Sequence, residues 1–161
     1  MQPGPEVSDT MNHHDECPKI CIVGTNKLDY ELLSFCLENE IKAECVLHAE
    51  FPPGDFSDSE IGRQRVWLFD CMGLDTVDLK KRFEIFMAAQ PVDILVALFN
   101  VAPECRLEHF IRQNRIRGVF LQSDSRHAFL KGIRTILDGH LWLSRKMLSD
   151  CIMMPHEQLN P

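Results

Sequence analysis

Short apolar runs alternate along the chain with longer segments whose apolar residues recur at helical spacing. The runs end at glycine or polar residues, as strands buried on both faces of a parallel sheet do. This alternation predicts an α/β fold, an open and mostly parallel five-stranded sheet with helices on both faces. The expected strands are residues 19–24, 43–48, 65–72, 92–99 and 118–122, and the expected helices are residues 29–40, 75–90, 103–114, a fourth that Ser123 or Asp124 caps and Gly139 ends, and 145–153.

The ends of the chain differ in character from this alternating middle. Residues 1–17 contain Pro, Gly, Ser and acids without Lys or Arg, which is typical of a flexible tail. Residues 18–153 form one domain, interrupted by a Pro- and Asp-rich loop at 51–64, and residues 154–161 resemble the start of a linker. No apolar run is long enough to span a bilayer and no signal pattern precedes the domain, so we expect a cytoplasmic protein without membrane contact.

Cysteine and histidine usage argues against a metal centre. The seven cysteines include no CxxC pair, and we expect free, buried thiols in a reducing compartment. His13 and His14 stand beside Glu16 and Cys17, but no second cluster at ligand spacing completes a metal site. No nucleophile–base pair is evident, so we expect neither a metal cofactor nor an enzyme.

The net charge of −7 is unevenly distributed. Residues 112–146 carry eight Lys and Arg side chains against two Asp, so this segment has a charge of +6 and the remaining residues sum to −13. A basic region on an acidic protein suits an anionic partner, although solvated helix faces would give the same count.

The order of elements over residues 18–139 resembles the receiver domain of two-component response regulators. Asp70, at the end of the third strand, falls where that family keeps its phosphoacceptor. The acidic pair that would hold a divalent cation is replaced by Gly24-Thr25-Asn26, the Ser/Thr of the fourth strand by a residue of Leu98-Phe99-Asn100, and the lysine of the fifth by Gln122. A lone carboxylate is a poor hard-cation site, so we interpret Asp70 as a vestigial phosphoacceptor.

The C-terminal segment resembles the VpsT/CsgD branch of LuxR/FixJ-type transcription regulators, whose receiver continues through a glycine into an extra sixth helix. Members of that branch that bind cyclic di-GMP carry Trp, then Phe/Leu/Met/Thr, then Ser/Thr, then Arg. Trp142-Leu143-Ser144-Arg145 matches these four positions, and Lys131 occupies the position of a lysine that the family uses one helix earlier. The resemblance therefore implies the receiver strand order 2-1-3-4-5 and a cyclic di-GMP site.

The chemistry of these side chains suits a ligand with two purines and two phosphates. Trp142 offers a polarizable apolar surface, and Arg145 can stack on a guanine or donate to its O6/N7 edge. Ser144 is a good N-cap for the last helix, whose start favours phosphate. Lys131, and with it Arg134 on the same polar helix face, supplies positive charge to the phosphates.

The same resemblance makes the last helix a dimerisation element. Its apolar stripe has nothing obvious in the chain to cover it, and ligand that binds only a dimer would promote homodimerisation. DNA would be bound only through a helix-turn-helix domain that this chain does not contain. The expected interface residues are Met147, Leu148, Cys151 and Ile152.

Two other interpretations stay open at this point. The Trp142 motif can be a packing element that plugs the edge of the sheet, in a receiver-like module that dimerises without binding nucleotide. A phosphoreceiver that uses Asp70 is the third possibility.

Overall fold

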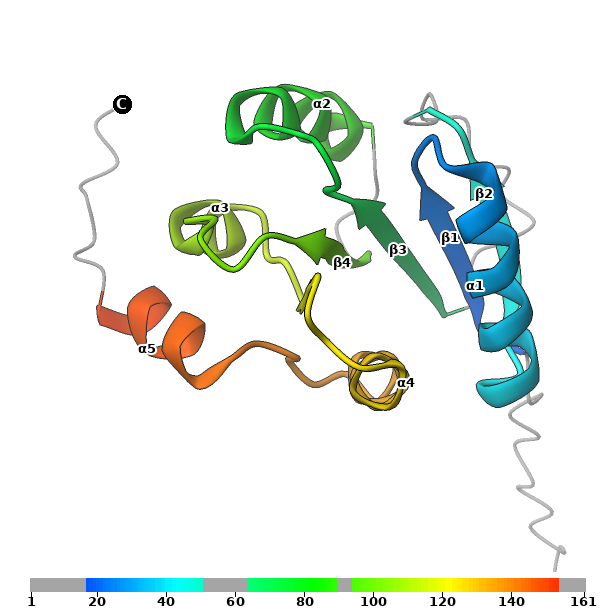
Figure 1. The fold of residues 1–161 in the computed structure, drawn as a ribbon. Coiled ribbons are helices and arrows are strands. Elements are labelled where there is room, and N and C mark those ends of the chain that lie inside the picture. Colours follow the sequence, from blue (N-terminus) through cyan, green and yellow to red (C-terminus); the bar gives the residue numbers. More distant parts are fainter. Residues whose placement is uncertain (1–16, 51–63, 90–93, 154–161) are drawn as a thin grey trace, which may run out of the picture.

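The computed structural model describes residues 17–50, 64–89 and 94–153, and the expected tail at 1–17, loop at 51–64 and linker at 154–161 lie almost wholly outside these ranges. Strands and helices alternate along the described chain (Figure 1). The elements are β1 (Lys19–Val23), α1 (Lys27–Glu40), β2 (Glu44–His48), β3 (Arg65–Asp70), α2 (Thr76–Ala88), β4 (Leu95–Val101), α3 (Glu108–Gln113), β5 (Gly118–Leu121), α4 (Arg126–Leu137) and α5 (Arg145–Met153).

The five strands form one parallel sheet in the order β2-β1-β3-β4-β5, which confirms the fold class and strand order. The register places Cys21 of β1 opposite both Val46 of β2 and Trp67 of β3. Because the strands are parallel, their carboxyl ends meet at one edge of the sheet, where ligand chemistry is usually found in such folds.

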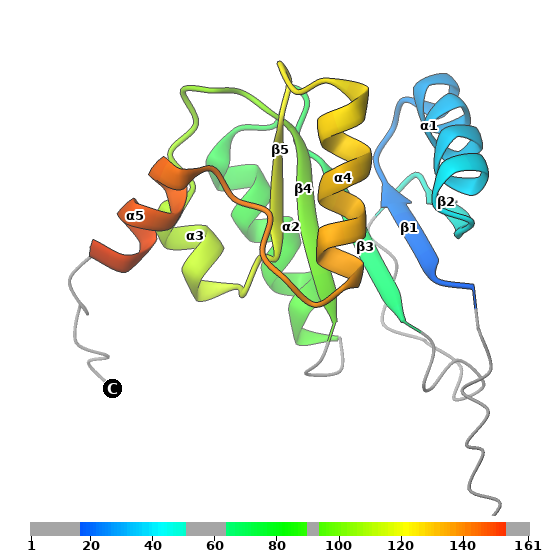
Figure 2. The ribbon, with the colours of Figure 1, turned by 90° about the horizontal axis from the view of Figure 1, so that it is seen from below.

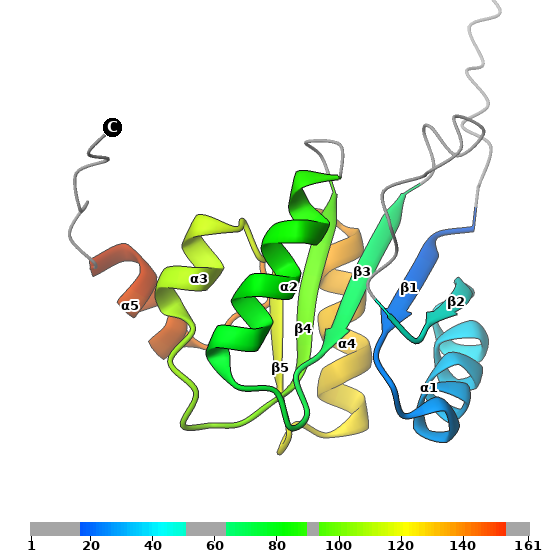
Figure 3. The ribbon, with the colours of Figure 1, turned by 90° about the horizontal axis from the view of Figure 1, so that it is seen from above.

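Helices cover both faces of the sheet, and each face has its own core (Figures 2 and 3). On one face α2 and α3 bury Phe83, Phe86 and Phe110 against β3 and β4. On the other face α1 and α4 bury aliphatic side chains that include Leu37 and Ile133. Both cores are almost entirely apolar, so burial of apolar area is the main term that stabilises the fold.

Helix α5 lies beyond the β5 edge of the sheet, beside α3 (Figure 2). Helix α4 ends at Leu137, and Gly139 follows with a φ of +85° that suits glycine, as predicted. Trp142 then pairs with β5: its N–H donates to the Arg117 carbonyl at 2.8 Å, and its carbonyl accepts from Val119 N–H at 2.9 Å. The predicted sixth helix is thus the fifth helix among the described residues.

Three local predictions were wrong. Apolar residues at helical spacing in 29–40 lead one to expect Leu32 and Phe35 to face the sheet, but both are exposed, and Tyr30 and Leu37 are buried instead. Helix α3 begins at Glu108 rather than near Pro103. The cap of α4 is Ser125, whose hydroxyl accepts from the Ala128 N–H, rather than Ser123 or Asp124.

All seven cysteines are free thiols, as expected, but only Cys21 is fully buried. In the described ranges no helix has both the length and the apolar character needed to cross a bilayer.

Candidate functional site

The carboxyl edge of the sheet holds Asp70 in a closed network of hydrogen bonds. The hydroxyl of Tyr30 donates to its Oδ2 at 2.5 Å. The side-chain amide of Asn100 and the backbone N–H of Met72 both donate to its Oδ1 at 2.9 Å. Both carboxylate oxygens are therefore engaged by groups of the chain itself, which satisfies a partly buried acid without a cation.

Tyr30 fills the space over Gly24, one of the positions at which the resemblance to receivers implies metal-binding acids. A Cβ placed on Gly24 would overlap the Tyr30 hydroxyl, so the phenol lies directly over the end of β1. Burial, together with the hydrogen bond to Asp70, raises the pKa of Tyr30 to about 12, so the phenol remains a neutral donor at physiological pH. The cavity left beside these residues is only about 60 Å³.

Gln122 completes this edge from β5. Its side-chain amide donates to the Asn100 carbonyl at 3.2 Å and approaches the Met72 sulfur at 3.7 Å. Asn100 has a φ of +55°, a left-handed conformation that asparagine tolerates better than most residues. Within the described ranges no three His, Cys, Asp or Glu side chains gather as metal ligands. The arrangement supports a structural role for Asp70, as a carboxylate that ties β3 to α1 and β4.

The segment that carries the tryptophan motif meets β5 through a single bridge between Trp142 and Gly118, and its apolar side chains divide between the two faces of the sheet. Trp142 packs with the core formed by α1 and α4. Leu143 packs with the opposite core, and both it and Leu141 line a cavity next to α3 and α5. Neighbouring residues of an extended segment point to opposite sides, so Leu141 and Leu143 do not share the surroundings of Trp142.

The indole of Trp142 is half-buried and packs on α4 and β5. A Cβ on Gly132 would overlap Cε1 of Phe120 and would lie 2.8 Å from Cδ1 and Cε2 of Trp142. The rings of Phe120 and Trp142 are stacked, with centroids 6.4 Å apart. Trp142 therefore has a structural role at the edge of the sheet, as one of the two alternatives predicted, and it also lies against the residue next to Lys131.

The remaining polar residues of the motif are exposed around this indole. Lys131 and Arg145 are both exposed, and in the part of the chain that the structure describes neither forms an ion pair. The hydroxyl of Ser144 accepts from the Met147 N–H at 3.1 Å, which confirms that Ser144 caps α5. Two exposed cations, without an ion pair among the described residues, thus lie on the elements that flank Trp142: Lys131 next to Gly132 on α4, and Arg145 at the start of α5.

Arg134 does not join this group. Its guanidinium donates to the Glu40 carbonyl at 2.9 Å, at the C-terminal end of α1. Arg126 extends to the same residue and forms an ion pair with the Glu40 carboxylate, also at 2.9 Å. Arg134 is therefore engaged in joining α4 to α1, and the prediction that it assists Lys131 receives no support from its geometry.

The apolar stripe of α5 is partly covered by the chain itself, contrary to the sequence-based expectation. Met147 and Cys151 pack against the core beside α3, and the Cys151 thiol donates to the Glu108 carbonyl at 3.5 Å. Leu148 is half-buried, whereas Ile152 is 77% exposed. Of the four expected interface residues, only Ile152 is largely free for contact with a second subunit.

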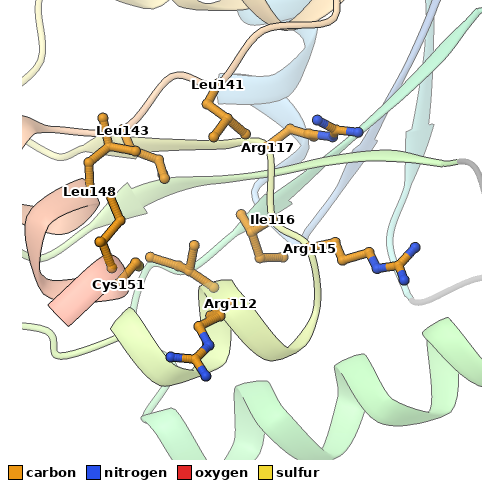
Figure 4. A pocket seen from close by; sticks show the side chains of 10 residues that line it. Arg112, Arg115, Ile116, Arg117, Leu141, Leu143, Leu148 and Cys151 are labelled. Carbon is orange, nitrogen blue, oxygen red and sulfur yellow. The ribbon is translucent and has the colours of Figure 1, made fainter. Parts of the chain in front are cut away.

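A cavity of about 460 Å³ lies between α3, α5 and the connection to β5 (Figure 4). The sequence-based search missed it, although Arg112, Arg115 and Arg117 alternate there with Ile111 and Ile116. Arginines interleaved with isoleucines over seven positions are a usable signal, whereas their net charge alone predicts only a general basic region.

The parallel sheet in the order 2-1-3-4-5, with helices on both faces and Asp70 at the end of β3, defines a receiver-like domain. The structure is similar to the regulatory domain of the master biofilm regulator CsgD, with a TM-score of 0.68, 20% identity, and coverage of 84% of this chain and 99% of that one. It is also similar to the response regulator ChrA of a heme-sensing two-component system, with a TM-score of 0.54, 13% identity, and coverage of 89% and 69%. These likenesses confirm the receiver-like fold.

At the level of sequence, no protein-family model and no curated protein matches the chain. The fold therefore rests on three-dimensional similarity, and function has to be argued from the residues of the site.

Proposed function

We propose that this chain is a non-enzymatic, receiver-like regulatory domain of a transcription regulator that binds cyclic di-GMP and dimerises in response, without phosphorylation. The observation that carries the proposal is the contact between Gly132 and the Trp142 indole. Lys131 is the exposed neighbour of Gly132 on α4, so we infer that a ligand on the Trp142 indole also reaches the Lys131 ammonium, although Lys131 and Trp142 stand eleven positions apart in the sequence.

Each group of the proposed site suits one part of cyclic di-GMP. The unpaired Lys131 ammonium and the capped start of α5 favour phosphate. The Arg145 guanidinium can stack on guanine or form paired hydrogen bonds with its O6/N7 edge. The Trp142 ring is held by Phe120 and Gly132, so it provides a rigid apolar wall that loses little entropy on binding.

Binding of a ligand would give this domain a signal in place of phosphorylation at Asp70. The carboxylate of Asp70 accepts hydrogen bonds from Tyr30 and Asn100, and the described residues place no group of metal ligands beside it, which favours an input other than phosphorylation. A regulatory domain needs two states that some signal favours unequally. Binding of an anionic nucleotide near α5 would bias the position of that helix, which carries no fully buried residue.

Calorimetric titration with cyclic di-GMP tests the ligand. We expect saturable binding by the unaltered chain and a loss of at least tenfold in affinity for Arg145→Ala, because a charged hydrogen bond contributes about 1.5–3 kcal/mol. Lys146→Ala is the matched control, since it removes a neighbouring exposed cation outside the motif. Absence of heat with the unaltered chain would refute the ligand and favour an interaction module that binds no nucleotide.

Light scattering tests the dimer. We expect the mass to shift toward a dimer when cyclic di-GMP is added, and we expect Ile152→Glu to prevent that shift by placing a charge on an exposed apolar contact. Because Ile152 is 77% exposed, the variant should unfold at the same urea concentration as the unaltered chain. A dimer that persists in Ile152→Glu would place the interface elsewhere.

A further inference from the structure

The cavity between α3 and α5 is built differently from the proposed nucleotide site. Its floor is aliphatic and is formed by Ile116, Leu143 and Leu148, from three separate segments. In Figure 4 Leu143 and Leu148 lie on the side of α5, and Ile116 lies between them and Arg115. Its volume of about 460 Å³ is within the range of small-molecule sites in proteins.

Arginines form the rim of this cavity. The side chains of Arg115 and Arg117 extend to the same side, away from α5 (Figure 4). Arg117 is half-buried and Arg115 is exposed, and the lining residues include no carboxylate to neutralise them. Arg112, also on the rim, already interacts with other groups of the chain. A concave apolar floor beside two like charges is complementary to a molecule with an apolar body and an anionic end.

Arg115, at the rim of the cavity, has a backbone conformation that favours glycine. Arg115 has a φ of +53°, in the left-handed region that glycine normally occupies after a helix C-terminus. A glycine there would make the same turn from α3 into β5 without the cost of the Cβ. Lys42 makes the same left-handed turn after α1, so this conformation is not specific to the cavity, but at Arg115 it sets a guanidinium among the lining residues.

We propose that this cavity is a second ligand site, which binds an aliphatic carboxylate of medium chain length. The alkyl chain lies on Ile116, Leu143 and Leu148, and the carboxylate accepts hydrogen bonds from Arg115 and Arg117. A ligand there contacts both α3 and α5, two elements otherwise tied by the packing of Met147 and Cys151 and by the Cys151–Glu108 hydrogen bond. It would therefore fix the position of the helix that the proposed dimer uses.

Calorimetry on the full chain with octanoate, decanoate and dodecanoate, below the concentrations at which they form micelles, tests this site. Affinity should rise about fourfold for each added methylene that becomes buried. Dodecylamine and dodecanol are the charge controls, and they should bind at least tenfold more weakly than dodecanoate. Equal binding of all three dodecyl compounds, or no binding of dodecanoate, would overturn the proposal.

Arg115→Gly separates loss of the site from loss of the fold. It removes the guanidinium and relieves the strained backbone, so the midpoint of thermal unfolding should rise by about 3 °C while dodecanoate affinity falls about tenfold. Arg115→Gly/Arg117→Gln should remove binding entirely, and Lys146→Gln, outside the cavity, should retain it. Unchanged dodecanoate binding in the double variant would refute the role of the arginines. Cyclic di-GMP binding should be unaffected by Arg115→Gly, so the two ligand proposals can fail independently.

Discussion

Replacing Gly132 by alanine is expected to lower the free energy of unfolding by about 2 kcal/mol, although alanine is the better helix former. Gly132 lies in the middle of α4, where helix propensity alone would predict a gain of about 1 kcal/mol. The added Cβ would overlap Phe120 and approach Trp142, and both rings are held in a packed layer. Overpacking of this layer should outweigh propensity, and urea unfolding of the two proteins measures the difference.

A double-mutant cycle tests whether a clash with Trp142 causes the loss of stability in Gly132→Ala. If the clash is with the indole, Gly132→Ala combined with Trp142→Leu should be less destabilised than the sum of the single variants. Gly139→Ala is the matched control, because its φ is +85° and its Cβ would meet no atom within 4 Å. That control should lose about 1 kcal/mol through backbone strain alone, and Trp142→Leu should not restore it. A stability gain in Gly132→Ala would contradict the packing described for α4.

The same variant connects packing with the proposed ligand site. A displaced Trp142 indole would no longer present its surface beside Lys131, so Gly132→Ala should also weaken cyclic di-GMP binding. We expect this loss of affinity for cyclic di-GMP to be smaller than the loss of stability. Its observation would support both a structural and a binding role for Trp142.

Replacing Tyr30 by phenylalanine is expected to lower the free energy of unfolding by about 1.5–3 kcal/mol at neutral pH, because a hydrogen bond to a charged carboxylate is lost. The pKa of Tyr30 is raised from 10.0 to about 12 by burial and by Asp70, so the folded state keeps a proton that the unfolded state releases. This contribution is complete below pH 10 and is lost as the pH rises to about 12.

The stability difference between the unaltered protein and Tyr30→Phe should therefore shrink between pH 10 and 12. Urea unfolding of both proteins across this interval measures it. Burial also raises the pKa values of Cys45 and Cys71 to about 12, but both proteins contain these thiols, so their effect cancels in the comparison. A difference that stays constant with pH would show that the phenol does not stabilise the fold through its proton.

Much of the fold could be predicted because its determinants are local in the sequence. The apolar runs of β1, β3 and β4 are buried on both faces, and such runs indicate central parallel strands. Gly139 ends α4 and Ser144 caps α5, and both effects depend only on the conformation of one residue and its near neighbours. The substitutions at Gly24 and Gln122 likewise indicated that the receiver chemistry is missing.

Helix orientation was less predictable. Helix α1 has apolar residues on two sides, and spacing alone does not identify the side that faces the sheet. The sheet is covered by Tyr30 and Leu37, whereas Leu28, Leu32 and Phe35 are all exposed by about two thirds. The buried side is decided by Asp70, which is distant in sequence and accepts a hydrogen bond from the Tyr30 hydroxyl, and by Gly24, which leaves room for the phenol because it has no Cβ.

The sequence by itself determined the order of strands and helices, the absence of the receiver's acids and lysine, and the cluster of residues that begins at Trp142. Only the tertiary structure decided what those residues contact. Pairing of Trp142 with β5 sends its side chain to one face of the sheet and those of Leu141 and Leu143 to the other. The tertiary structure also brings Arg134 of α4 to the Glu40 carbonyl of α1, and it assembles the arginine-rimmed cavity from α3, α5 and the segment before β5. The physical reason is that these contacts link residues far apart in the chain, so local propensity and spacing carry no information about them.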